Sequence, residues 1–103
     1  MSGSGYVAVL VIDLHFPEAG SLKAKRKELS SIKAQLQTRM GVAVSETGHQ
    51  DLWQRAQLLA ALTGGSPGPL AAAADKVERW VLARCPDGAH VERVLLSMED
   101  LRP

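Results

Sequence analysis

The chain has 103 residues, of which 46% are hydrophobic and 22% are charged. This composition is ordinary for one small globular domain with its own core, and it excludes a largely disordered or collagen-like chain. The net charge is only +1, yet residues 21–40 hold six basic side chains against the single acid Glu28, so the basic character belongs to one segment.

The first predicted element is a strand over residues 6–16, a near-continuous apolar run rich in β-branched side chains. Pro17 and Gly20 interrupt this run, and Ser21 then occupies the position of a helix N-cap. A helix over residues 22–39 is predicted from apolar residues at helical spacing, which are Leu22, Leu29, Ile32, Leu36 and Met40.

Two strands are predicted next, separated by a turn that opens at Gly48. Gly41 ends the helix, and residues 42–47 alternate between apolar and polar side chains as an outer strand does. Residues 52–62 also divide into two alternating sets, which favours a strand, with a helix as the rival interpretation.

A second helix is predicted to begin with Gly68 as its cap and Pro69 as its first residue. A turn signal at residues 86–88 ends it, and residues 89–100 form the last predicted strand. The order strand, helix, strand, strand, helix, strand predicts an α+β fold, the ferredoxin-like βαββαβ sandwich. Its antiparallel sheet has four strands, the first and third of them central, and both helices cover one face.

One domain is expected over residues 1–103, with a flexible N-terminus at residues 1–5. Cys85 is the only cysteine, which excludes an intramolecular disulfide and suits a reducing cytoplasm. The N-terminus lacks a basic stretch ahead of an apolar run, and residues 6–14 are too few to cross a bilayer. We therefore expect a cytoplasmic protein without a signal peptide or a membrane anchor.

Three separate motifs resemble the YlxP-like family of small bacterial proteins, a domain of unknown function. They are residues 15–17 (HFP), residues 21–26 (SLKAKR) and residues 49–56 (HQDLWQRA). The resemblance covers residues 6–62, and Met40 and Gly41 depart from the aromatic residue and asparagine expected there. It implies a ferredoxin-like fold and a bacterial cytoplasmic setting. Genes of the family commonly lie among those for translation initiation factor two and ribosome-binding factor A, which implies a connection with RNA or the ribosome.

The basic start of the first helix is the main candidate site. Cations in the first turns oppose the helix dipole, so helix propensity does not explain Lys23, Lys25, Arg26 and Lys27. Together with the free backbone N–H groups there, these side chains predict contacts with phosphates, as in RNA. The alternative interpretation is a solvated patch that maintains solubility.

A possible secondary surface consists of Trp53, Arg55 and His15. In the predicted strand Trp53, Arg55 and Gln57 share the face away from the helices, where an aromatic ring beside an arginine can stack an unpaired base. The alternative is a tryptophan packed against a loop or a subunit.

Histidines and aspartates near two strand ends raise the possibility of a metal or acid–base site, formed by Asp13, His15, His49 and Asp51. We expect His15 and His49 at opposite ends of the sheet, more than roughly 20 Å apart, with structural roles. The acylphosphatase mechanism is excluded because the loop after the first strand has no arginine and the sequence has no asparagine. No catalytic residue, metal or cofactor is therefore expected.

The open face of the sheet suggests a different function. Five apolar side chains are predicted to form an exposed patch there, namely Val7, Val9, Val11, Val91 and Leu95. Such a patch favours a homodimer or another protein partner. The sequence thus predicts a non-enzymatic cytoplasmic protein that binds RNA or the ribosome, with a homodimeric protein-interaction module as the alternative.

Overall fold

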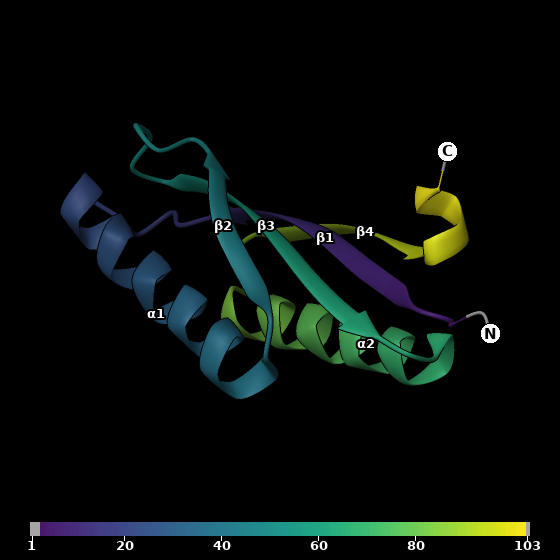
Figure 1. Cartoon of the computed structure of the whole chain (residues 1–103). Helices are drawn as coiled ribbons and strands as arrows, with labels where there is room; N and C mark the ends of the chain where they lie inside the picture. The colour runs from purple at the N-terminus through teal and green to yellow at the C-terminus, as the bar shows by residue number, and fades with distance from the viewer. Residues whose placement is uncertain (1–2, 103) are drawn as a thin grey trace.

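The computed structural model describes residues 3–102 and contains four strands, two α-helices and one short 3-10 helix (Figure 1). Part of the expected flexible N-terminus, residues 1–2, lies outside the described residues. In chain order the elements are β1 (Tyr6–His15), α1 (Leu22–Met40), β2 (Ala43–Gly48), β3 (Arg55–Gly64), α2 (Pro67–Arg84), β4 (Ala89–Ser97) and η1 (Met98–Leu101).

The strands form one antiparallel sheet in the order β2-β3-β1-β4, and both helices lie on the same face of it (Figure 1). β1 is paired along its whole length with β3, from Tyr6 opposite Gly64 to His15 opposite Arg55. This arrangement confirms the ferredoxin-like βαββαβ prediction, including the central position of the first and third strands.

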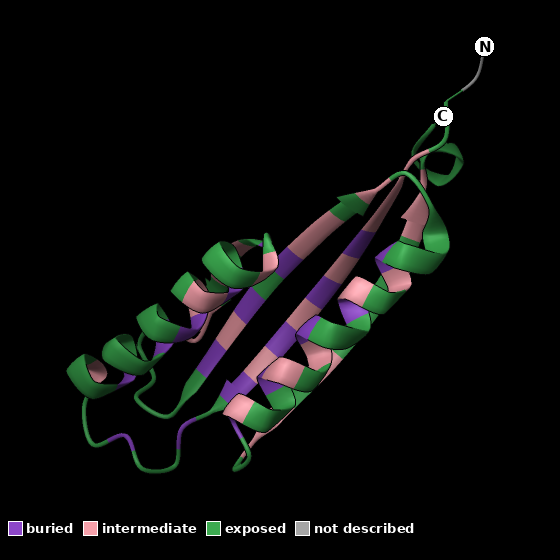
Figure 2. Cartoon of the chain, turned by 90° about the horizontal axis from the view of Figure 1, so that it is seen from below, coloured by how far each residue is buried: buried purple, intermediate pink, exposed green. Residues whose placement is uncertain are grey.

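The core lies between the helices and the two central strands, and buried residues alternate along both strands in Figure 2. Alternation is expected because successive side chains of a strand point to opposite faces. The helices contribute the apolar stripes that the spacing predicts. The buried apolar residues of these elements are Ala8, Leu10, Ile12, Leu14, Leu29, Ile32, Leu36, Ala56, Leu58, Ala60, Leu70, Ala74, Val77 and Val81.

Both predicted boundaries of α1 are built as expected. Ser21 caps the start, where its hydroxyl accepts a hydrogen bond from the Ala24 N–H at 3.1 Å. Gly41 ends the helix with φ 63°, a left-handed conformation that glycine adopts without a Cβ clash. Neither helix of the described residues is long and apolar enough to cross a membrane.

Other element boundaries differ from the predictions. α2 begins at Pro67 after Ser66, rather than at Pro69 after Gly68. The segment predicted as a strand from residue 52 joins the sheet only at Arg55, and the helical alternative is wrong. β4 ends at Ser97 because Ser97 and Asp100 form a reciprocal capping box that begins η1.

The predicted open-face patch also needs a correction. β4 places Val91 opposite Ile12 and Leu95 opposite Ala8, so both share the helix-facing side of the sheet with these buried residues. The open face instead receives Val94 and Leu96, opposite Val9 and Val7. A one-residue difference in position exchanges the two faces of a strand, and local sequence does not specify it here.

Candidate functional site

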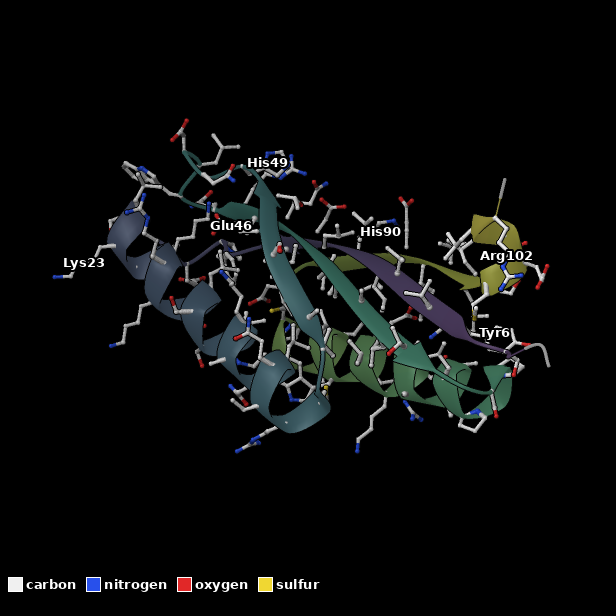
Figure 3. The ribbon with its side chains drawn as sticks, viewed as in Figure 1. Tyr6, Lys23, Glu46, His49, His90 and Arg102 are labelled. Atoms are coloured by element: carbon white, nitrogen blue, oxygen red, sulfur yellow. The ribbon has the colours of Figure 1, made fainter. Side chains whose placement is uncertain are left out.

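The three sequence motifs meet at one end of the sheet. β1 ends there at His15 and is followed by the start of α1, and β3 starts there at Arg55, opposite His15. The loop of residues 49–54 leads from the end of β2 into β3 at the same end. Figure 3 shows Lys23 of α1 and His49 of this loop at that end, with Tyr6 and Arg102 at the other. We call it the loop end of the molecule.

The prediction that His15 and His49 lie at opposite ends is therefore wrong. β2 runs parallel to β1, because each is antiparallel to β3. After the α1 crossover the chain again runs in the direction of β1. β2 therefore ends at the same end of the sheet as β1. The loop that follows β2 consequently carries His49 to the end of the sheet that holds His15.

Hydrogen bonds join the motifs directly. The Phe16 N–H donates to the Gln54 carbonyl at 2.7 Å. The Gln54 side-chain amide donates to the carbonyls of Pro17 and Ala19 at 3.1 and 3.4 Å. Gln54 thus fixes the end of the loop to the segment after β1. This anchoring role was absent from the predicted site, and an amide preceding a strand gives no local signal of it.

The four basic residues at the α1 start do not share one environment. Lys25 is only 1% exposed, and its ammonium donates to the His49 carbonyl at 2.5 Å. It is therefore not available to a phosphate at the surface. Lys23, Arg26 and Lys27 are exposed, and the Lys23 side chain in Figure 3 extends away from the sheet.

Trp53 lies in the loop before β3 and not on a strand face, which corrects its predicted position. Trp53 is 54% exposed, so about half of its surface remains accessible. Arg55, the first residue of β3, is exposed on the open face. The side-chain amide of Gln57 donates a hydrogen bond to the Asp13 carboxylate at 3.2 Å.

His15 is exposed and borders a shallow hollow of about 450 Å³ at this edge of the open face. Arg55 and Asp13 also line the hollow, together with His90 of β4, which the sequence analysis did not single out. His90 lies opposite Asp13 in the sheet, a relation that depends on the β1–β4 register. The hollow therefore combines one guanidinium, two imidazoles and one carboxylate.

The described residues contain no group of three or more His, Cys, Asp or Glu side chains placed to hold a metal ion. Burial raises the pKa of the Cys85 thiol, the nearby Arg84 charge lowers it and Glu28 raises it further. The net rise disfavours the thiolate, the nucleophilic form. The exposed groups at the loop end include the cations Lys23, Arg26 and Lys27, which can contact phosphates, and the indole of Trp53, which can stack on a base.

Comparison with known proteins agrees with the motifs. The family model described as "Protein of unknown function (DUF503)" matches residues 7–95. The "Uncharacterized protein YlxP" of Bacillus subtilis (strain 168) is 50% identical over 38 residues, which are 37% of this chain. The match spans 41% of that relative, so the chain covers well under two thirds of its length.

Among solved structures, the de novo designed protein Foldit4 has a TM-score of 0.55 and 11% sequence identity. The match covers 89% of this chain and 96% of the designed one. The designed protein LFR1 1 with ferredoxin fold reaches a TM-score of 0.42 at 12% identity, covering 87% and 83% of the two chains. At 11% identity, the similarity to Foldit4 shows a shared fold alone.

Proposed function

The chain belongs to the DUF503 family of proteins of unknown function, and from this premise we propose that it binds RNA through its loop end, without catalysis. One observation carries the proposal. The exposed Trp53 lies at the same end of the molecule as the cations of the α1 start and of Arg55. Residues 15–27 and 49–55 together hold four exposed basic side chains, Lys23, Arg26, Lys27 and Arg55, against two acidic ones.

Each type of side chain has a separate task in this proposal. Lys23, Arg26 and Lys27 contact phosphates and supply affinity that depends on salt but not on base sequence. Trp53 stacks an unpaired base, and Arg55 with His15 contacts the adjacent backbone. An exposed ring in a loop reaches the splayed bases of an RNA loop or end, whereas it cannot enter a continuous helix.

The proposed RNA partner is ribosomal. The support for this choice is the resemblance to a family whose genes commonly lie beside those of translation and ribosome-binding factors. The first experiment is co-sedimentation with ribosomal subunits from the protein's own cell extract, at low and raised salt. We expect association at low salt that weakens as salt rises.

Two sets of variants test the surface. The triple variant Lys23→Ala, Arg26→Ala, Lys27→Ala removes three exposed cations of the loop end. Its matched control removes three exposed cations elsewhere, Arg39→Ala, Lys76→Ala and Arg79→Ala. For a single-stranded RNA, losing three phosphate contacts lowers the slope of log affinity against log salt by roughly 2. The control retains the wild-type slope.

Trp53→Ala tests stacking separately. We expect a loss of about 1–3 kcal/mol in binding free energy with an unchanged salt slope, because the indole carries no charge. Equal affinities and slopes for wild type, the loop-end triple variant and Trp53→Ala would exclude this surface as the RNA site.

A homodimer through the open sheet face is the second candidate. The observation that favours it is an apolar area away from the helices, which includes Leu59 at 41% and Val94 at 49% exposure. The same face carries the carboxylates of Asp13 and Glu92 and the basic groups of Arg55 and His90. Because both signs of charge are present, a second copy can complement the face without a net like-charge excess.

Sedimentation equilibrium over a wide range of protein concentration tests this candidate. A dimer predicts that Leu59→Arg shifts the protein to the monomer, because it buries an unpaired charge in the interface. Leu82→Arg on α2 is the matched control, since Leu82 is 42% exposed on the other side of the molecule. A wild-type monomer at every concentration would remove the homodimer from consideration.

A further inference from the structure

Lys25 is the one buried charged residue of the described chain. It lies in the first turns of α1, in line with the buried residues Leu29 and Ile32 four and seven positions later. Burying an ammonium group is unfavourable unless hydrogen bonds replace its hydration. The hydrogen-bond partner of the Lys25 ammonium therefore shows what compensates its burial.

That partner is the carbonyl of His49, 2.5 Å from the Lys25 Nζ. The same carbonyl accepts the Leu52 N–H at 3.1 Å, so it is shared between the helix and the loop's own turn. His49 is also the only non-glycine residue of the described chain with positive φ, at 62°. This sparsely populated conformation persists where surrounding contacts determine it.

The loop is consequently fixed on both sides of Trp53. Lys25 holds its beginning through His49, and Gln54 holds its end through the carbonyls of Pro17 and Ala19. Between the two anchors Trp53 remains 54% exposed. A loop tied at both ends holds an exposed ring in one orientation without burying it.

We propose that Lys25 is a positioning residue for RNA binding. Its ammonium acts through the His49 carbonyl to hold residues 49–54, and thereby presents Trp53 to an unpaired base without touching the RNA. This inference rests on the proposed function. It differs from the expectation for Lys25 drawn from the sequence, because a positioning lysine adds no phosphate contact and leaves the salt slope of binding unchanged.

The test compares Lys25→Met with Lys23→Met. Methionine keeps an unbranched side chain of similar length but removes the donor, and apolar replacement of a buried charge is often tolerated. Lys23→Met removes an exposed cation from the same helical turn. Hydrogen exchange of residues 49–54, detected by mass spectrometry, reports on the loop, while titration of a single-stranded RNA at several salt concentrations reports on binding.

For Lys25→Met we expect roughly tenfold faster exchange confined to residues 49–54 and severalfold weaker RNA binding, with the wild-type salt slope. For Lys23→Met we expect wild-type exchange and a salt slope lower by roughly 0.7. Wild-type loop exchange in Lys25→Met would overturn the positioning role. So would a fall in its salt slope equal to that of Lys23→Met, because that fall identifies a phosphate contact.

Two further outcomes remain decisive. If the wild-type protein binds no RNA, the proposed function fails, while loop exchange alone still decides whether Lys25 fixes residues 49–54. If Lys25→Met does not fold, as judged by circular dichroism, Lys25→Gln replaces it. Its shorter side chain keeps a neutral donor but does not reach as far, and the same results support or overturn the proposal.

Discussion

His15 and Gly88 show how closely backbone and side chain approach at the loop end. The His15 N–H donates to the Gly88 carbonyl at 2.9 Å. A Cβ atom added to Gly88 would lie 2.6 Å from the His15 Cβ, closer than two carbon atoms can pack. Because a Cβ cannot rotate away, the position accepts only glycine unless the two strands move apart.

We therefore predict that Gly88→Ala destabilises the protein by about 1–3 kcal/mol, the usual cost of forcing an extra carbon into a packed site. Gly68→Ala is the control, because nothing lies within 4 Å of the added Cβ at that helical position. Alanine is favoured in helices, so the control is expected to be neutral or slightly stabilising. Equal unfolding midpoints in urea for the two variants would contradict the steric argument.

The buried thiol of Cys85 makes the free energy of unfolding depend on pH. Burial raises the pKa of its thiol from the usual 9.0, so the folded chain retains the proton more strongly than the unfolded chain. The contribution of the Cys85 thiol to the free energy of unfolding is fully present below the pKa that this thiol has in the unfolded chain. It is lost as the pH rises through the higher pKa of the folded chain.

Between about pH 8 and about pH 10, a range that brackets the usual thiol pKa of 9.0, the wild type should lose more unfolding free energy than Cys85→Ala. Urea unfolding of both proteins across this range measures the difference. Parallel pH profiles would show that the thiol does not ionise differently in the folded and unfolded states.

At the scale of the elements, the two α-helices begin differently. The Ser21 hydroxyl accepts a hydrogen bond from the Ala24 N–H, whereas Ser66 before α2 makes no side-chain capping bond. The first turn of α1 contains no acidic residue that would favour the helix dipole. The α1 start therefore depends on its cap more than an acidic start would.

Ser21→Ala is predicted to lower stability by about 1 kcal/mol, since it leaves a backbone donor of α1 without its partner. Ser66→Ala should change stability by only a few tenths of that amount, because no capping bond is lost. Thermal or urea unfolding checks both. A loss as large for Ser66→Ala as for Ser21→Ala would indicate that the serine hydroxyls act through something other than these caps.

For the whole molecule, the strand order β2-β3-β1-β4 makes β3 and β1 the central strands, and we expect these to be the most stable part of the sheet. β1 pairs with a neighbour on both sides, and its alternate residues form the core beneath both helices. Within residues 3–102, β2 and β4 each have one edge without a strand partner. The proposed RNA site adjoins the end of this central strand, so the anchored loop of residues 49–54 lies against the most extensively paired strand of the sheet.

Native-state hydrogen exchange should be slowest in β1 and β3 and roughly tenfold or more faster at unpaired amides of the β4 edge. NMR exchange at low protein concentration measures this order. If amides of the β4 edge are as protected as those of β1, something covers that edge. Protection that rises with protein concentration would identify a second copy.

Local patterns in the sequence determined the order of the elements, the Ser21 and Gly41 boundaries of α1 and most of the core. They could do so because capping, turn chemistry and hydrophobic periodicity act within a few residues. Spacing even places Lys25 in line with Leu29, although its charge favoured a surface role. The exposed cations Lys23, Arg26 and Lys27 follow from the same helical pattern.

Only the tertiary structure decided which segments meet and which faces they present. The register of β4 turned Val91 and Leu95 toward the helices, and the parallel course of β1 and β2 brought His49 to the end of the sheet that holds His15. Lys25 is held under the loop by a hydrogen bond to His49, which lies 24 positions later in the chain, and Gln54 is anchored to Pro17, which lies 37 positions earlier. Trp53 is left outside the strand. Such pairings are selected by packing across the whole sheet, which no local stretch of sequence contains.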